Sequence, residues 1–141
     1  MPSITISDTS CLILFHKIGK LNLLKELFGT ITITDTVLKE YNEAIPDWIS
    51  VINPKTNVHD ELAGYLDLGE ASSIALAYEH EGSLIIIDEI KGRKAARELA
   101  MKVTGSLGIL IAAKRNGYLE VVKPVIDDMI SAIQTFEYHR N

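Results

Sequence analysis

The chain has 141 residues, of which 47% are hydrophobic and 23% are charged. This length and composition are typical of one globular domain, expected to span residues 1–141, and they exclude the fibrous and intrinsically disordered classes. The formal net charge of −5 argues against binding nucleic acid through bulk positive charge, since phosphate contacts usually come from Lys and Arg.

Neither membrane insertion nor secretion is indicated. The longest apolar runs, at residues 84–87 and 109–113, are far shorter than the roughly 20 residues that span a bilayer. The first residues lack the basic start and long apolar stretch of a secretory signal, and Cys11 has no partner for an internal disulfide. We therefore expect a cytoplasmic protein without membrane association.

The first half of the chain alternates short strands with helices. Residues 4–7 alternate and are β-branched, which predicts a strand, and the apolar segment 11–18 behind three capping residues predicts a helix. The next elements are predicted in this order: a helix over 21–28, a strand over 31–34, a helix capped by Asp35 that ends before Pro46, a brief strand at 51–52, and an irregular connection to Asp60.

The clearest strand lies in the second half. Residues 84–87 form a continuous apolar run, typical of parallel strands covered on both faces. The elements around it are predicted in this order: helices over 60–68 and 69–82, a basic helix over 91–102 that buries Ala95, Ala96, Leu99 and Ala100, a strand and turn at 103–105, and helices over 107–115 and 125–136. This alternation predicts an α/β fold with a mostly parallel sheet.

Acidic residues follow both of the most clearly predicted strands. Asp8 stands directly after the first strand, and Asp88 and Glu89 stand directly after the central one. Ligands of parallel sheets bind beyond the carboxyl ends of the strands, so we expect these acids at one edge. Glu40, in the third helix, and Glu70, in the first turn of the helix before the central strand, are candidates to face the same crevice.

Four carboxylates gathered in one place would raise one another's pKa unless a cation lies among them. Oxygen ligands without a cluster of His or Cys favour Mg²⁺ or Mn²⁺. Two such ions about 4 Å apart can activate a water and stabilise the leaving oxygen in phosphodiester hydrolysis. The pattern therefore favours a metal-dependent nuclease.

Each acid also has an ordinary structural interpretation. Asp8 and Asp88 can cap the helices that follow them, Glu70 can interact with a helix dipole, and Glu40 can lie on a solvated face. These interpretations do not explain why acids follow both strands. The joint functional interpretation is therefore preferred.

Polar and basic residues near the acids leave two interpretations open. Thr9 and Ser10 either orient Asp8 and hold a metal-bound water, or cap the helix. Gly105, which lies between the hydroxyl residues Thr104 and Ser106 at a strand end, either approaches a phosphate through its backbone or forms a plain turn. The basic helix either follows an RNA backbone or faces solvent, and its candidate RNA-binding residues are Arg93, Lys94 and Arg97.

Several segments together form a recognisable pattern: residues 6–13, 37–40, 68–71 (Leu-Gly-Glu-Ala), 84–89, Gly92-Arg93 and 104–108 (Thr-Gly-Ser-Leu-Gly). These segments resemble those of PIN-domain proteins, and the likeness extends to about Ile126. The chain is most similar to a prokaryotic branch of PIN-like proteins, described as predicted nucleic-acid-binding proteins and related to VapC-type toxin ribonucleases.

The resemblance implies a three-layer α/β/α fold of the RNase H-like kind and an Mg²⁺- or Mn²⁺-dependent endoribonuclease that acts on RNA. It assigns the four family acids to Asp8, Glu40, Glu70 and Asp88, with Glu89 as a helper or substitute. Glu70 replaces the more usual Asp, and Glu89 stands where the branch commonly has Asp. The resemblance further implies a homodimer and a small antitoxin protein encoded beside the gene.

Other classes fit less well. A phosphoacceptor receiver domain needs an acidic pair after the first strand, where this chain has only Asp8, and a haloacid-dehalogenase-like phosphatase needs Asp in place of Ser10. No dinucleotide or P-loop motif follows a strand. The remaining alternative is a non-catalytic RNA-binding or protein-interaction module on the same fold.

Overall fold

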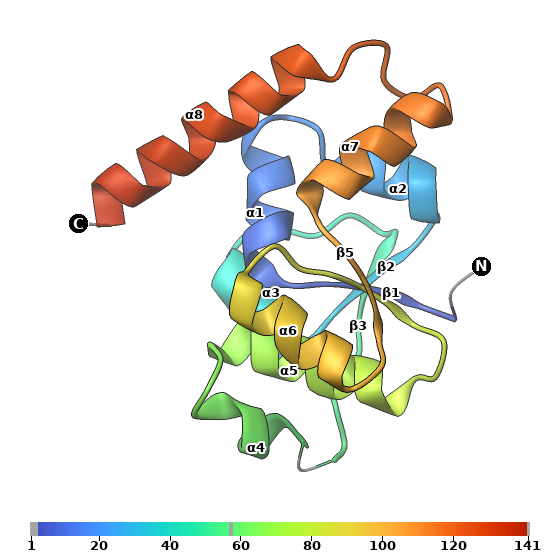
Figure 1. Cartoon of the computed structure of the whole chain (residues 1–141), viewed down its shortest axis with the longest axis vertical. Coiled ribbons are helices and arrows are strands. Elements are labelled where there is room, and N and C mark those ends of the chain that lie inside the picture. Colours follow the sequence, from blue (N-terminus) through green and yellow to red (C-terminus); the bar gives the residue numbers. More distant parts are fainter. Residues whose placement is uncertain (1–2, 57, 141) are drawn as a thin grey trace.

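The computed structural model describes residues 3–56 and 58–140, which are built around a parallel sheet (Figure 1). Its strands are β1 (Thr5–Ser7), β2 (Ile31–Ile33), β3 (Ile49–Val51), β4 (Leu84–Ile86) and β5 (Lys102–Thr104). They pair in the order β3-β2-β1-β4-β5, every pair being parallel. The chain first adds β2 and β3 on one side of β1 and then adds β4 and β5 on the other side. The winding reverses between β1 and β4, where open parallel sheets bind ligands.

Helices connect the strands and cover both faces of the sheet. They are α1 (Thr9–Lys17), α2 (Asn22–Phe28), α3 (Asp35–Tyr41), α4 (Val58–Ala63), α5 (Leu68–Glu79), α6 (Ile90–Glu98), α7 (Ser106–Arg115) and α8 (Lys123–Arg140). Side chains of α1, α2, α7 and α8 pack on one face, and those of α5 and α6 pack on the other. The predicted α/β fold with three layers is confirmed.

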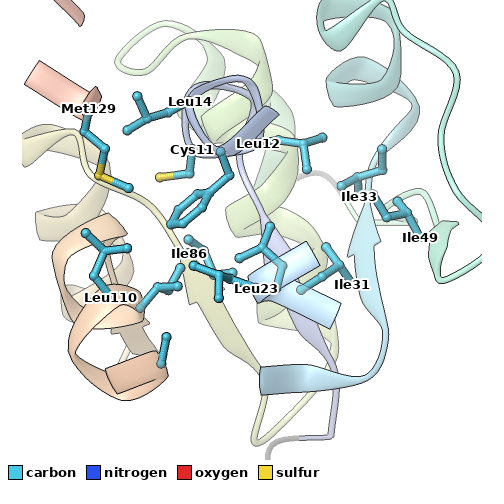
Figure 2. Packing of buried hydrophobic residues seen from close by; sticks show 14 of the residues in the cluster. Cys11, Leu12, Leu14, Leu23, Ile31, Ile33, Ile49, Ile86, Leu110 and Met129 are labelled. Carbon is cyan, nitrogen blue, oxygen red and sulfur yellow. The ribbon is translucent and has the colours of Figure 1, made fainter. Parts of the chain in front are cut away.

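The larger core lies between the sheet and the layer that contains α1 (Figure 2). Leu12 and Phe15 of α1 are fully buried there, and the same cluster contains Ile86 of β4, Leu110 of α7 and Met129 of α8. The three-residue spacing of Leu12 and Phe15 puts both on one face of the helix. This cluster fixes α1, and with it the residues that precede α1, against the sheet.

Strand β4 and the residue after it, Ile87, contribute to both cores. Ile86 belongs to the larger cluster, whereas Ile85 and Ile87 pack with α5 and α6. All three are fully buried, because successive strand residues point to opposite faces and both faces are covered. The prediction of a central strand covered on both sides is confirmed.

The helix expected over 60–68 is shorter than predicted. Helix α4 ends at Ala63, and a turn leads to Asp67, whose carboxylate accepts a hydrogen bond from the Glu70 N–H at 2.9 Å and caps α5. The chain stops being helical between α4 and α5 because this cap starts a new helix.

The end of the basic helix is also corrected. Helix α6 ends at Glu98, and the next strand begins at residue 102, where the helix had been expected to continue. Ala95 and Ala96 are buried as predicted, but Leu99 and Ala100 are exposed. Ala100 has a left-handed φ of 60°, which turns the chain out of the helix and into β5.

Smaller shifts affect other boundaries. Strand β3 begins at residue 49 rather than 51, and α8 extends beyond the expected range on both sides. Helix α3 is capped by Thr34 rather than Asp35, since the Thr34 hydroxyl oxygen accepts the Val37 N–H at 3.2 Å.

Within residues 3–56 and 58–140, no helix is both long and apolar enough to cross a membrane. The single domain predicted over residues 1–141 includes residues 1–2, 57 and 141, which lie outside the described residues, and it stays a prediction.

Two leucines provide a matched test of the core. Leu12 is fully buried, whereas Leu107 on α7 is 57% exposed. We expect Leu12→Ala to lower the free energy of unfolding by about 2–5 kcal/mol, because it leaves a cavity, and Leu107→Ala to change it by less than about 1 kcal/mol. Urea denaturation followed by circular dichroism measures both values. Equal losses would contradict the described packing.

Candidate functional site

Asp8 lies directly after β1, at the point where the winding of the sheet reverses. Its N–H donates to the Ile86 carbonyl at 3.1 Å, and its carboxylate accepts the Cys11 N–H at 3.0 Å. The side chain therefore caps α1, as the structural interpretation predicted, but Asp8 is only 1% exposed. Burial raises the pKa of Asp8 to about 7, because the charged form loses its water, and nearby Asp88 adds to this effect.

Glu70 lies in the first turn of α5, under α6, and is 5% exposed. Its Oε2 atom lies against Gly92 of α6, where an added Cβ would stand 2.7 Å away. Within the described part of the chain this oxygen has no hydrogen-bond partner. Burial raises the pKa of Glu70 to about 8, with further contributions from Asp67 and Asp8. A buried carboxylate oxygen without a partner is costly, and a bound cation would compensate it.

Asp88 follows β4 and is held by Ser106, the first residue of α7. Ser106 donates its N–H to Asp88 Oδ1 at 2.7 Å and its hydroxyl to Oδ2, so both carboxylate oxygens are fixed. The cap of α6 is Glu89, whose carboxylate accepts the Lys91 N–H at 3.4 Å. The capping interpretation is thus wrong for Asp88. Asp88 and Glu89 are both exposed, so this side of the site is open to solvent.

Glu40 is brought to the same edge by a contact between α3 and α1. The Thr9 hydroxyl donates to Glu40 Oε1 at 2.6 Å, and both groups lie against Gly69 at the start of α5. The carboxylate of Glu40 thus contacts Thr9 and Gly69, which are the neighbours in sequence of the buried acids Asp8 and Glu70. Thr9 therefore orients Glu40 rather than Asp8. Ser10, the other hydroxyl residue considered, is exposed on α1.

The acids influence one another electrostatically. Asp88 and Asp67 raise the pKa of Asp8, and Asp67, Asp8 and Glu89 raise that of Glu70. Asp67, Asp88 and Glu89 therefore lie near the two buried acids, in one negatively charged region at the carboxyl edge of β1 and β4.

Two members of this region were missed from the sequence. Asp67 was assigned to the inside of a helix, although an Asp three residues before a Glu at a helix start is a capping signal. Ser106 is predicted from the sequence to belong to a turn or to a backbone approach to phosphate, and not to bind Asp88. Its contact with Asp88 joins residues 18 positions apart, and no local pattern indicates such a contact.

Whether these residues suit a divalent cation depends on the donors they offer. Among the described residues, no three His, Cys, Asp or Glu side chains are close enough to form a ready-made metal site. The acids surround the edge, two of them buried and two exposed, rather than converging on one point. Nevertheless, the unpartnered oxygen of Glu70 and the all-carboxylate donor set fit Mg²⁺ or Mn²⁺, which prefer hard oxygen ligands.

The other predicted residues differ in their exposure. Thr104 accepts the Ile87 N–H through its carbonyl at 2.9 Å, and its side chain lies against Gly108. Lys94 and Arg97 are exposed on α6, as an RNA-binding role requires, whereas Arg93 is half-buried.

The all-parallel α/β sheet carries its acids at the carboxyl edge, where ligands of such sheets bind. The family model described as a PIN domain matches residues 4–138, and the chain belongs to the PIN-domain family. This confirms the resemblance found in the sequence. PIN domains are generally nucleases, and they typically use a divalent metal. Comparisons with curated proteins and with solved structures give no match.

The raised pKa values of Asp8 and Glu70 predict how the stability of the metal-free protein depends on pH. Their ordinary values are 3.8 and 4.5, and their values in the fold are about 7 and about 8. Because the folded state binds these protons more tightly, the stabilisation is complete below about pH 4 and is lost as the pH rises through about 7 to 8. We expect Glu70→Gln to weaken this loss.

Thermal denaturation in EDTA between pH 5 and pH 8 measures the effect. The melting temperature of Glu70→Gln should rise relative to wild type as the pH increases, while the exposed control Asp128→Asn should follow wild type. The same pH dependence in wild type and Glu70→Gln would show that this carboxylate is not the buried titrating group.

Proposed function

We propose that this protein is an Mg²⁺- or Mn²⁺-dependent endoribonuclease that hydrolyses RNA phosphodiester bonds at the carboxyl edge of β1 and β4. The observation that carries the proposal is the pair of buried carboxylates, Asp8 and Glu70, beside the exposed Asp88. Positive charge close to such a pair favours its ionised form at neutral pH. Membership of a family of nucleases supports the same conclusion.

The residues around the acids have separate roles in this proposal. Asp8, Glu40, Glu70 and Asp88 would hold the cation, with Glu89 beside them. A bound divalent cation supplies charge that lowers the pKa of an attacking water and stabilises the leaving oxygen. Ser106 keeps both oxygens of Asp88 in a fixed orientation, and Thr9 does the same for one oxygen of Glu40.

RNA would approach from the exposed side of the edge. Asp88 and Glu89 are open to solvent there, and α6 begins at the next residue, Ile90. Lys94 and Arg97 are exposed on this helix and would contact phosphates. Positive charge on α6 thus offsets the negative net charge of the chain close to the cleavage site.

Replacing single acids tests the proposal directly. We expect Asp8→Asn and Asp88→Asn to lower the rate of RNA cleavage by about 100-fold or more, because each removes a carboxylate that binds the cation. Asp128→Asn on α8, an exposed acid outside this region, should retain the wild-type rate. Labelled single-stranded and structured RNAs are incubated with Mg²⁺, Mn²⁺ or EDTA, and cleavage should require metal.

The alternative is a non-catalytic RNA-binding or protein-interaction module on the same fold. It predicts RNA affinity that persists in EDTA and is the same in wild type and in both Asn variants. Inactivity on every RNA, with no metal bound in calorimetry, would support this alternative and contradict the nuclease.

A protein partner completes the proposal. Leu107 and Ile111 lie one turn apart and exposed on α7. Ile130 and Ile133 are exposed on α8, whose C-terminal end projects beyond the other helices (Figure 1). Exposed apolar side chains of this kind are typical of protein contacts. We propose that the protein forms a homodimer and that a small antitoxin protein binds it and inhibits cleavage. Light scattering tests the first, and inhibition by the product of an adjacent small reading frame tests the second.

A further inference from the structure

Arg93 forms hydrogen bonds with the turn between β4 and α6, which contains Asp88 and Glu89. Its Nη1 donates a hydrogen bond to the carbonyl oxygen of Ile87 at 3.0 Å. Ile87 directly precedes Asp88, and the Arg93 N–H donates to the Glu89 carbonyl at 2.9 Å. Both the backbone and the side chain of Arg93 therefore hold the connection between β4 and α6.

Because Gly105 has no side chain, the Arg93 guanidinium can lie close to its backbone. A Cβ added at Gly105 would collide with Asp88 Oδ1 and would stand 2.7 Å from Arg93 Nη1. The carboxylate and the guanidinium thus adjoin the same small space. Within the described residues they form no salt bridge, so Arg93 acts on Asp88 through the backbone rather than by direct pairing.

Asp88 is consequently held from two sides. Ser106 of α7 binds both of its oxygens, and Arg93 of α6 binds the carbonyl of the residue before it. The carbonyl of Ile87 lies just beyond the end of β4, and a buried backbone carbonyl needs a donor. Arg93 supplies that donor at the position from which the Asp88 side chain projects.

We propose that Arg93 is a positioning residue that fixes the turn between β4 and α6, and through it the carboxylate of Asp88, rather than a residue that follows the RNA backbone. Lys94 and Arg97 differ from it because both are exposed. The consequence for catalysis rests on the proposed function, whereas the consequence for the turn does not.

The test compares Arg93→Met, which removes the donors, with Arg93→Lys, which keeps one, and with the exposed control Arg97→Met. In metal-free protein, hydrogen–deuterium exchange of residues 86–91 should be about 10-fold faster in Arg93→Met. It should be near wild type in Arg93→Lys and unchanged in Arg97→Met. Calorimetry should show Mn²⁺ affinity about 10-fold weaker in Arg93→Met alone, as for the loss of an outer-shell partner.

For RNA binding measured in EDTA, we expect an effect of Arg97→Met and no effect of Arg93→Met. Arg97→Met should reduce the slope of log affinity against log salt concentration by about 1, as expected for one lost phosphate contact, and Arg93→Met should leave it unchanged. Unchanged exchange over residues 86–91 in Arg93→Met, or a loss of salt slope equal to that of Arg97→Met, would overturn the inference.

The remaining outcomes are also decisive. If Arg93→Met unfolds while Arg97→Met does not, Arg93 stabilises the whole fold rather than this turn, and the inference is overturned. If wild type neither binds Mn²⁺ nor cleaves RNA, the proposed function fails. The exchange measurement would still decide the role of Arg93, because it needs neither metal nor RNA.

Discussion

The parallel pairing of β1 with β4 is the constraint on which the candidate site depends. Ser7 stands opposite Ile86, and the Asp8 N–H extends the pairing by donating to the Ile86 carbonyl. The acids that follow the two strands therefore leave the sheet at the same level. A slip of one residue would turn every side chain of the strand to the other face, and the burial of Ile86 in the larger core prevents it. The hydrophobic core thus sets the position of the polar site.

The buried carboxylates at this edge of the sheet lower the stability of the fold when they are charged. Asp8 and Glu70 are enclosed where an uncompensated charge is costly, and Glu70 Oε2 has no partner among the described residues. Neutral side chains of similar size would remove this cost. Strongly shifted carboxylates in such a position are more typical of functional sites than of a scaffold. The buried leucines and isoleucines on both faces of the sheet supply the stability that tolerates them.

The correct predictions from the sequence combine local residue patterns with one general rule about where parallel strands end. The apolar run ending at Asp88, and the rule that parallel strands share a carboxyl edge, were sufficient to place Asp8 beside Asp88. Contacts between distant segments were not accessible in this way. The bond from Thr9 to Glu40 depends on how α3 packs against α1, and the role of Arg93 depends on the path of its side chain to Ile87. Helix α6 ends earlier than predicted because the chain turns at Ala100, which has a left-handed φ. Alanine as a residue type does not indicate such a conformation.

The absence of a side chain at Gly92 lets α6 lie directly over the buried carboxylate of Glu70. A methyl group at this position would stand 2.7 Å from Glu70 Oε2 and closer still to a side-chain carbon of Ile87. Even alanine would therefore push α6 away from the acid that it covers. The enclosure of Glu70, which raises the pKa of its carboxyl, thus depends on a residue that contributes no side chain of its own.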